Sequence, residues 1–407
     1  MARCKKLASF SEDAGGTRRT FLSPPMRDCH REIAEWLRPL GVPVQVDAAG
    51  NLRALYPAAK PASSRLLVGS HLDTVPNAGA YDGILGVVLA AALLQGLDGR
   101  TLPYGIEVVG FSEEEGVRFG TPFIGSRALV GNVDEELLAR TDSQGISVRR
   151  AIEDFGLNPA EMGRAVLNND VLGYLEFHIE QGPLLEKHEL PLGVVDAIAG
   201  QSRLEVTFTG RSNHAGTTPM DQRYDAIAGA AEWISAVERL ACGVSGLVAT
   251  VGMVEARPGV ANVIAGEVRL GLDVRHGAND VRMRTVEDLI HQAEEIAQRR
   301  SLTVRCETKL NQKAVAMDPF LSQQIEEAIR KVGCKPYRMV SGAGHDAMIL
   351  AEKVPVAMIF LRTPGGISHD PAESVLVEDV AKAIECGLQL LDQLAVTPAF
   401  QTRTDRA

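Results

Sequence analysis

The stretch LLVGSHLDTVPNAGAYDGILG, residues 66–86, organises the rest of the chain. The apolar run Leu66–Val68 predicts a short buried strand that ends near His71. A loop rich in proline, asparagine and glycine then leads to Asp82, and an apolar helical pattern follows from Ile84. Imidazole and carboxylate are ligands that Zn²⁺ and Mn²⁺ take, so the stretch indicates a metal site. The other interpretation is a loop histidine beside a helix-capping aspartate.

Strands and helices alternate on either side of this stretch. Strands are predicted at residues 44–46, 52–56, 106–111 and 173–179, and helices at 25–39 and 84–97. Such alternation predicts a mostly parallel sheet that is covered on both faces. Ligands of these sheets bind beyond the carboxyl ends of the strands. His71, the acids after Phe111 and His178 all fall near such ends, so we expect one shared site.

The pattern changes at about Gly200, where apolar and polar residues alternate and predict a half-solvated strand. The elements that follow have the order βαββαβ, which is a compact unit able to fold as its own layer. Helix–strand alternation returns after about Val315. We therefore expect an α/β domain with a mixed, mostly parallel sheet, formed by residues 1–199 and 316–407. An α+β domain of residues 200–315 is inserted between its two segments.

Composition excludes several classes of protein. The formal net charge is −10, with 52 acids against 42 bases, which argues against a nucleic-acid partner. The longest apolar stretch, Ile84–Leu94, is shorter than the ~20 residues that span a bilayer, so no membrane partner is expected. The basic start of the chain is followed by polar residues, which argues against a secretory signal. Six scattered cysteines without a C-x-x-C pair fit reduced thiols, so we expect a cytoplasmic protein.

Further segments place polar groups near predicted strand ends. In Glu113–Glu115 one carboxylate could bind a dication while its neighbour stays free as a general base; an acidic run is otherwise a solvated surface. His178 lies within EFHIEQG, residues 176–182, although a half-buried strand would show the same pattern. The glycine-rich loops SGAGHD (341–346) and GGISHDPAE (365–373) permit close approach of the backbone.

Taken together, these segments resemble the M20-type metallo-amidohydrolases of the hydantoinase/carbamoylase branch. The resemblance runs from about residue 12 to residue 395 and rests on GSHLDTV, YDG, EEEGVRF, HIEQGPLLE, SNHAGTTPM, NVIAGE, DVRH, SGAGHDA and GGISHDPAE. It implies an enzyme with two divalent metal ions per subunit, Zn²⁺ or Mn²⁺, with Co²⁺ also accepted. It also implies that the inserted domain is a lid and a dimerisation module, so a homodimer is expected.

The resemblance also implies roles for single residues. Five residues match metal ligands: His71, Asp82, Glu115, His178 and His369. Asp82 is implied to bridge the two ions, Glu114 to act as the general base, and Asp73 to orient a ligand without binding metal. Four residues match positions that hold substrate: Gln181, His214, Asn262 and Arg275. His214 is implied to reach the site of the neighbouring subunit. The neighbouring residues His345 and Asp346 match a family loop without a firm role.

The chemistry of these side chains agrees with the implied roles. Arg275 offers a planar fork that suits a carboxylate, although an exposed arginine at a strand end would look the same. His214 could equally be a turn histidine. Asn262 precedes a predicted strand and Arg275 follows its end, so we expect both to face one side of the inserted domain.

We therefore expect hydrolysis of a ureido, or N-carbamoyl, C–N bond in a small substrate bearing a carboxylate, with release of ammonia and carbon dioxide. Segments 73–75, 78–83, 115–119 and 365–369 are most similar to allantoate amidohydrolases. IGSRAL, residues 124–129, is instead common among N-carbamoyl-L-amino-acid hydrolases. The resemblance also leaves open a ureidoglycolate amidohydrolase, an M20 peptidase and a non-catalytic metal-binding relative. The complete ligand set argues against the last, and His178 argues against a peptidase, where relatives usually place an acid.

Overall fold

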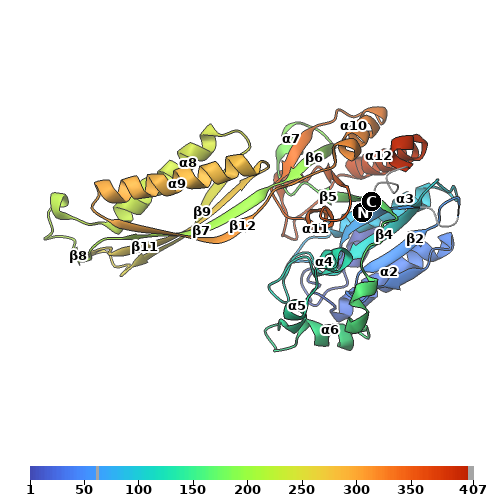
Figure 1. Ribbon diagram of the computed structural model, residues 1–407, viewed down its shortest axis with the longest axis horizontal. Coiled ribbons are helices and arrows are strands. Elements are labelled where there is room, and N and C mark those ends of the chain that lie inside the picture. Colours follow the sequence, from blue (N-terminus) through green and yellow to red (C-terminus); the bar gives the residue numbers. More distant parts are fainter. Residues whose placement is uncertain (61–63, 402–407) are drawn as a thin grey trace. The chain divides into compact units, whose positions relative to one another are not determined.

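The computed structural model describes residues 1–60 and 64–401, which divide into two compact units, each described here by itself (Figure 1). Unit 1 is made of three segments: Met1–Asp196, Met317–Met339 and the chain from Gly344 onward. Unit 2 is made of Ala197–Ala316 and Val340–Ala343. We predicted boundaries at residues 200 and 315, and we did not expect the short segment Val340–Ala343 to join the inserted unit.

A nine-stranded mixed sheet is formed mainly by residues of unit 1. In spatial order its strands are β1 (Val44–Val46), β2 (Leu52–Tyr56), β4 (Gly105–Phe111), β3 (Arg65–His71), β5 (Val171–Ile179), β15 (Val356–Leu361), β6 (Leu192–Ile198) and β13 (Val315–Ala316), with β14 (Arg338–Ser341) beside β6. The four central strands, β4, β3, β5 and β15, are parallel to one another. The strands outside them pair antiparallel. The predicted mixed, mostly parallel sheet is confirmed.

Helices cover both faces of this sheet. Helix α3 (Ile84–Gly96) is apolar on all sides up to Leu94 and almost entirely buried, and it packs against β3, β5 and α12 (Val377–Val396). Because a Cβ atom at Gly86 would lie 2.2 Å from the carbonyl oxygen of Phe177, only glycine lets α3 approach this closely. On the opposite face, the amide of Ala347 in α11 (Asp346–Leu350) donates to Glu176. Successive strand residues point to opposite faces, so His178 shares the α11 face with Glu176.

Some of the other helices of unit 1 begin at recognisable caps. Helix α2 starts at two prolines after Ser23, and Asp318 caps α10 by accepting from the amide of Leu321. The remaining helical segments are α1 (Ala2–Ala8), α2 (Pro24–Leu37), η1 (Arg38–Leu40), α4 (Ile124–Val130), α5 (Glu135–Ala139), α6 (Val148–Asp154), η2 (Pro159–Arg164), α7 (Leu184–Lys187), α10 (Pro319–Lys331), η4 (Pro364–Gly366) and α13 (Pro398–Gln401). Within the described part of the chain, no helix has the length and apolar character needed to cross a membrane.

Unit 2 is an antiparallel sheet with two helices on one face (Figure 1). Its strands, in spatial order, are β12 (Thr303–Gln312), β7 (Gly200–Thr209), β11 (Glu267–His276) and β9 (Val248–Arg257). The helices are α8 (Ala226–Gly243) and α9 (Asn279–Arg299), and a short turn, η3 (Met220–Gln222), precedes them. A separate two-stranded ribbon joins β8 (Asn213–His214) to β10 (Val263–Ile264). The order of the long elements is βαββαβ, as predicted.

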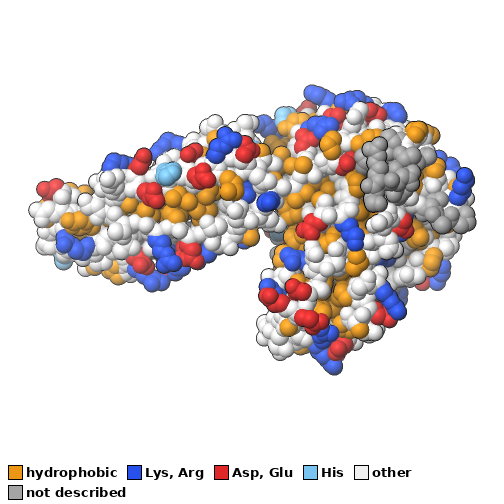
Figure 2. Space-filling view, in the orientation of Figure 1, with side chains coloured by type: hydrophobic (Ala, Val, Ile, Leu, Met, Phe, Trp, Pro, Cys, Tyr) orange, Lys and Arg blue, Asp and Glu red, His pale blue; other side chains and the backbone are white. Residues whose placement is uncertain are grey.

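The two faces of the unit 2 sheet differ in chemistry. Trp233 of α8 is fully buried, packs against Phe208, and donates its indole N–H to the carbonyl oxygen of Leu289 at 2.8 Å. The face without helices carries ion pairs between neighbouring strands, such as Glu205 with Arg269 at 2.6 Å. Basic and acidic side chains are also interspersed on the surface of this unit that Figure 2 shows. One buried face and one polar face are typical of a half-solvated sheet.

Candidate metal centre

Four parallel strands bring the candidate site to one edge of the unit 1 sheet. His71 is the last residue of β3, and His178 lies just before the end of β5. Glu114 and Glu115 follow β4, and the chain after β15 runs on to His369. Because these strands are parallel neighbours, their carboxyl ends lie side by side, where ligands of such sheets bind.

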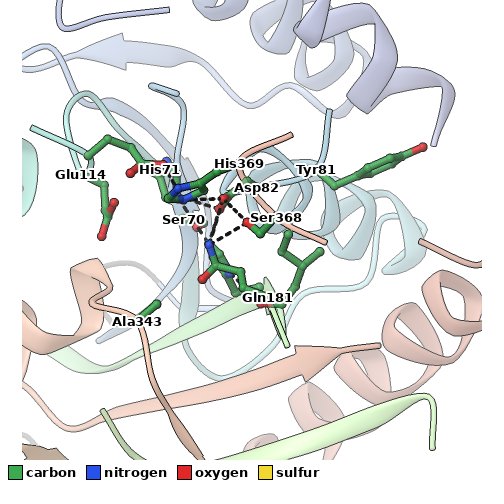
Figure 3. A network of polar contacts seen from close by, with 12 residues as sticks. Ser70, His71, Tyr81, Asp82, Glu114, Gln181, Ala343, Ser368 and His369 are labelled. Atoms are coloured by element: carbon green, nitrogen blue, oxygen red, sulfur yellow. Dashed lines mark hydrogen bonds and ion pairs between the residues drawn. The ribbon is translucent and has the colours of Figure 1, made fainter. Parts of the chain in front are cut away.

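Asp82 lies at the centre of the cluster (Figure 3). Its Oδ1 atom is 3.1 Å from Nε2 of His178 and 3.6 Å from Nε2 of His71. Its Oδ2 atom is 3.3 Å from Nε2 of His369, which in turn is 3.7 Å from Oε1 of Glu115. The two oxygens of one carboxylate therefore face two different groups of side chains.

Backbone carbonyls fix the orientation of both buried histidines. Nδ1 of His71 lies 2.9 Å from the carbonyl oxygen of Asp73, and Nδ1 of His178 lies 2.9 Å from that of Ile179. A carbonyl oxygen can only accept, so each Nδ1 carries a hydrogen, and each Nε2 presents a lone pair when its ring is neutral. Metal-binding histidines are held in this way. Both lone pairs are directed toward Asp82.

Potential ligand atoms form three overlapping groups within 4.8 Å: His71 with Asp82 and His178, Asp82 with Glu115 and His369, and His71 with Glu114 and Glu115. Oδ1 of Asp82 is buried and accepts no hydrogen bond from the described residues, although the Nε2 atoms of His71 and His178 lie beside it and 3.4 Å from each other. Either protons or cations must separate these lone pairs. Nitrogen and carboxylate donors in this arrangement fit divalent ions such as Zn²⁺ or Mn²⁺.

Asp73 contacts both the acidic turn and His71. Its Oδ1 accepts from the amide of Glu114 at 2.9 Å, and its Oδ2 accepts from the amide of Glu115 at 3.0 Å. Oδ1 also lies 3.6 Å from Nδ1 of His71. A single buried carboxylate thus fixes the acidic turn relative to the first histidine.

Negative charge accumulates around these residues. Burial raises the pKa of Glu114 well above its ordinary value, and the neighbouring Glu115 adds to the rise. Burial also raises the pKa of Glu115 to about 7, since the charge of Asp82 partly offsets the lowering by His71. Burial alone would lower the pKa of His71, but contacts with Asp73 and Asp82 raise it well above the ordinary value. The surrounding side chains therefore stabilise the carboxylate charges of Glu114 and Glu115 poorly, and bound dications would stabilise them.

Three site residues have backbone conformations with positive φ. Gly83 has φ +65°, and a Cβ atom there would lie 2.4 Å from the ring of His71. Gln181 and His369 have φ values of +58° and +57°, which cost conformational energy in residues with a side chain. Nε2 of Gln181 donates to Oδ2 of Asp82 at 2.9 Å. Such strain is typical of positions that hold functional groups in place.

The loop that precedes α11 forms a wall of the site. The ring of His345 packs edge-on against that of His178, with centroids 4.5 Å apart, and also contacts Phe360. Asp346 begins α11 and is fully buried. The ring of His345 therefore packs directly beside that of His178.

The predicted substrate residues fall in three places. Gln181 joins the cluster around Asp82 in unit 1. In unit 2, His214 pairs with Val263 in the small ribbon, and Asn262 accepts from the amide of Ala215 at 3.0 Å, so these two predicted residues are neighbours and both are exposed.

Arg275 lies near the opposite end of β11 from Asn262, so one small substrate cannot contact both within a single chain. Strand β11 separates them, and its rise of about 3.4 Å per residue puts roughly 27 Å between Glu267 and Arg275. The guanidinium of Arg275 is held by Asp273 at 2.9 and 3.2 Å and by the carbonyl oxygen of Gly342 at 2.7 Å. Sequence order alone could not show that the strand runs the full length of the unit.

Three residues without a predicted role also contact the cluster. Oγ of Ser368 donates to Oδ2 of Asp82 at 2.9 Å. Glu176 accepts from Ser70 at 2.9 Å and from the α11 amide of Ala347 at 3.1 Å, which links β3, β5 and α11 beneath the histidines. Glu373 accepts from the backbone next to Asp82. Ser368 and Glu373 lie within the GGISHDPAE motif, and this motif could have pointed to them in the sequence.

Comparison with known proteins agrees with this geometry. The description "Peptidase family M20/M25/M40" matches residues 67–393. The allantoate deiminase of Arabidopsis thaliana is 40% identical, covering 97% of this chain and 81% of that protein. The N-carbamoyl-L-amino acid amidohydrolase of Geobacillus stearothermophilus is 37% identical, covering 94% and 95%. A hydantoinase/carbamoylase family amidase from Burkholderia multivorans has a similar structure, with a TM-score of 0.91, 32% identity and 97% of both chains covered.

The chain therefore belongs to the peptidase family M20/M25/M40. It is an enzyme that hydrolyses C–N bonds, as the amidohydrolases among its relatives do. The family is metal-dependent, and the clustered His, Asp and Glu side chains of unit 1 supply the groups that could hold metal.

Proposed function

We propose that this enzyme hydrolyses a ureido, or N-carbamoyl, C–N bond in a small substrate that carries a carboxylate. The observation that carries the proposal is Asp82, whose two oxygens face two ligand groups with Glu114 beside them. Relatives named for allantoate and for N-carbamoyl-L-amino acids support the ureido class. Among these substrates we propose allantoate, because of its motif similarity and the 40% identity to the plant allantoate deiminase.

Five side chains would hold two divalent ions. His71 and His178 with Oδ1 of Asp82 would form the first site. Glu115 and His369 with Oδ2 of Asp82 would form the second. Dications in these sites would polarise the ureido carbonyl and lower the pKa of water near neutral pH.

Glu114 is proposed as the group that moves protons. Its carboxylate lies near His71 and Glu115 in one candidate ligand group, and Figure 3 shows it beside the cluster around Asp82. It would take one proton from the attacking water and give it to the departing nitrogen, so that ammonia leaves as the C–N bond breaks. The carbamate left on the substrate then loses carbon dioxide. Water plus the ureido group accounts for every atom released.

Arg275 is proposed to bind the substrate carboxylate, and Gln181 to orient the ureido group. A guanidinium has five N–H donors, and Asp273 and Gly342 take three of those of Arg275. The two that remain lie on Nη1 and Nη2, the pair that a carboxylate can engage as a fork. About a third of the side chain is exposed, so a ligand can reach it.

N-carbamoyl-L-amino-acid hydrolysis is the second candidate. The IGSRAL segment at residues 124–129 and the relative from Geobacillus stearothermophilus favour it. The residues proposed to bind metal and to move protons would be the same, because both substrates present a ureido group and a carboxylate.

We further propose a homodimer formed through unit 2. Strand β9 lies at the edge of its sheet and exposes Val248 and Val254 at 58% each and Met253 at 40%. An apolar edge strand invites pairing with another chain. A second copy would also explain the separation of His214 from Arg275, since one small substrate cannot touch both ends of β11 within a single chain. His214 and Asn262 would then serve the site of the partner.

The test is an ammonia-release screen with allantoate, several N-carbamoyl-L-amino acids, ureidoglycolate and dipeptides, with Mn²⁺ and Zn²⁺ added separately. Glu114→Gln protein prepared in parallel controls for contaminating activity. Ammonia from a ureido acid, absent with the variant, supports the proposal. Cleavage of dipeptides without ammonia release from any ureido acid would replace it with a peptidase function.

A further inference from the structure

Glu373 touches the backbone at Asp82 although 291 residues separate the two in sequence. Its Oε1 atom accepts from the amide of Tyr81 at 2.7 Å and from the amide of Asp82 at 3.0 Å. The side chain is only 5% exposed, so water does not compete for these bonds. One carboxylate oxygen therefore holds two successive amides of the loop that carries the central aspartate.

The segment that supplies Glu373 also supplies His369 and Ser368. Ser368 donates to Oδ2 of Asp82 at 2.9 Å, and His369 faces the same oxygen at 3.3 Å. The segment 368–373 thus contacts both the side chain and the backbone of Asp82. Figure 3 shows Asp82 between Ser368 and His369, while the ring of Tyr81 points away from the cluster.

The loop before Asp82 is bridged to Thr17 through Ala78, and it leaves room for Glu373 at Gly79. Residues 76–83 contain Pro76, Gly79 and Gly83, and the structure packs Gly79 directly under Glu373. A Cβ atom at Gly79 would lie 2.5 Å from Cβ and 2.7 Å from Oε1 of Glu373. The absence of a side chain at residue 79 therefore leaves the space that this carboxylate fills.

We propose that Glu373 is a positioning residue that holds Asp82 in the orientation in which its two oxygens serve two metal sites. It acts through the backbone of Tyr81 and Asp82 and does not itself bind metal. The inference rests on the proposed function only in that Asp82 is taken as the bridging ligand. Residues that orient ligands in this way commonly change metal affinity by about 10- to 100-fold when removed.

The test is a titration of exhaustively chelated protein with Co²⁺, followed by its visible absorption and by competition with a chelator. Glu373→Ala should weaken the binding of at least one Co²⁺ ion by about 10- to 100-fold. Glu373→Gln should restore most of the affinity, because one carbonyl oxygen can still accept from both amides. Gly79→Ala should weaken binding while Glu373 is unchanged in sequence, because the new methyl group displaces its carboxylate.

Glu180→Ala is the matched control. Glu180 is also buried and also accepts from two successive amides, those of Leu184 and Leu185 at 2.6 and 2.9 Å, but these begin a helix with no proposed ligand. Its Co²⁺ affinity should stay within about threefold of the wild type, which is well below the effect of losing an orienting contact. Equal affinity in Glu373→Ala and wild type, or equal losses in Glu373→Ala and Glu180→Ala, would overturn the inference. Failure of the wild type itself to bind Co²⁺ would instead contradict the proposed metal site.

Discussion

Glu114 and Glu115 are neighbours in sequence, yet their side chains have different surroundings. Glu115 lies 3.7 Å from His369 and belongs to two of the candidate ligand groups, whereas Glu114 belongs to one. Glu114→Gln should therefore keep its metal and lose turnover, with kcat lower by roughly 100-fold or more. Glu115→Gln should lower metal occupancy. Elemental analysis alongside kcat distinguishes them, and the reverse pattern would exchange the two roles.

Arg275 provides a second prediction at the scale of single residues. Arg275→Lys keeps the charge but loses the fork, so kcat/KM for a ureido acid should fall by the equivalent of about 2–4 kcal/mol. An analogue with an amidated carboxylate should lose much less, because it never used the contact. Arg269→Lys is the control, since Arg269 lies on the same sheet face and pairs with Glu205. Equal losses for acid and amide would show that Arg275 does not bind the carboxylate.

Single residues were predictable where a motif marks them, and their contacts were not. The sequence pattern places His71, His178 and the acidic run at strand ends, and the structure brings them together. It could not show that the carbonyl oxygen of Gly342 accepts from Arg275, because that contact depends on how the segment Val340–Ala343 joins unit 2. Nor could it show the bond from Glu373 to Asp82, because the two residues are 291 positions apart and the tertiary fold decides whether their loops meet.

At the scale of elements, we predict that the dimer forms at the edge strand β9. Val254 is 58% exposed on it, and we propose that a second copy covers this edge. Val254→Lys should turn a dimer into a monomer and raise the dissociation constant by roughly 100-fold or more. In a twofold interface the substitution is present in both copies, so two lysine charges would be buried. Analytical ultracentrifugation over a concentration series measures this. Val377→Lys, at a valine 62% exposed in unit 1, should leave the dimer intact.

A wild-type protein that sediments as a monomer at every concentration would contradict the dimer. A dimer that survives Val254→Lys and dissociates with Val377→Lys would move the interface to unit 1. The retention of ureido hydrolysis by a monomeric Val254→Lys variant would remove the proposed role of His214 in the partner site.

Hydrophobic periodicity made most elements predictable. The helix at α3 and the strands at β3, β4 and β5 follow from short apolar runs bounded by glycine, proline and polar residues. Periodicity does not reveal strand order, so the antiparallel strands at the edges of the unit 1 sheet could not be placed. It also does not reveal distances in space, so it could not show that Asn262 and Arg275 lie at opposite ends of β11. These properties arise from tertiary pairing.

At the scale of the whole molecule, buried charge is the property that separates this chain from an ordinary α/β protein. Asp73, Asp82, Glu113, Glu114, Glu176 and Asp346 are all at least nine-tenths buried in unit 1. Among the described residues, the partners of Asp73 and Asp82 are amides, Gln181, Ser368 and histidines, with no lysine or arginine. Burying that much charge is costly unless cations compensate it.

Stability should therefore depend on metal. A ligand present at 100 times its dissociation constant stabilises the folded state by about 2.7 kcal/mol per site, so chelation should lower the Tm by several degrees. Adding Mn²⁺, Co²⁺ or Zn²⁺ should restore it. Asp82→Ala should show little response to metal, because the residue proposed to serve both sites is gone. An unchanged Tm on chelation, measured by calorimetry, would contradict this.

The most direct measurement follows ammonia release from a ureido acid while metal is returned to exhaustively chelated protein, with metal content determined at each step. We predict no turnover without metal and a rise that reaches its plateau at two ions per chain. Asp82→Ala protein should stay inactive at every metal concentration. Full turnover in the chelated wild type, with no metal detected, would contradict the account of the site.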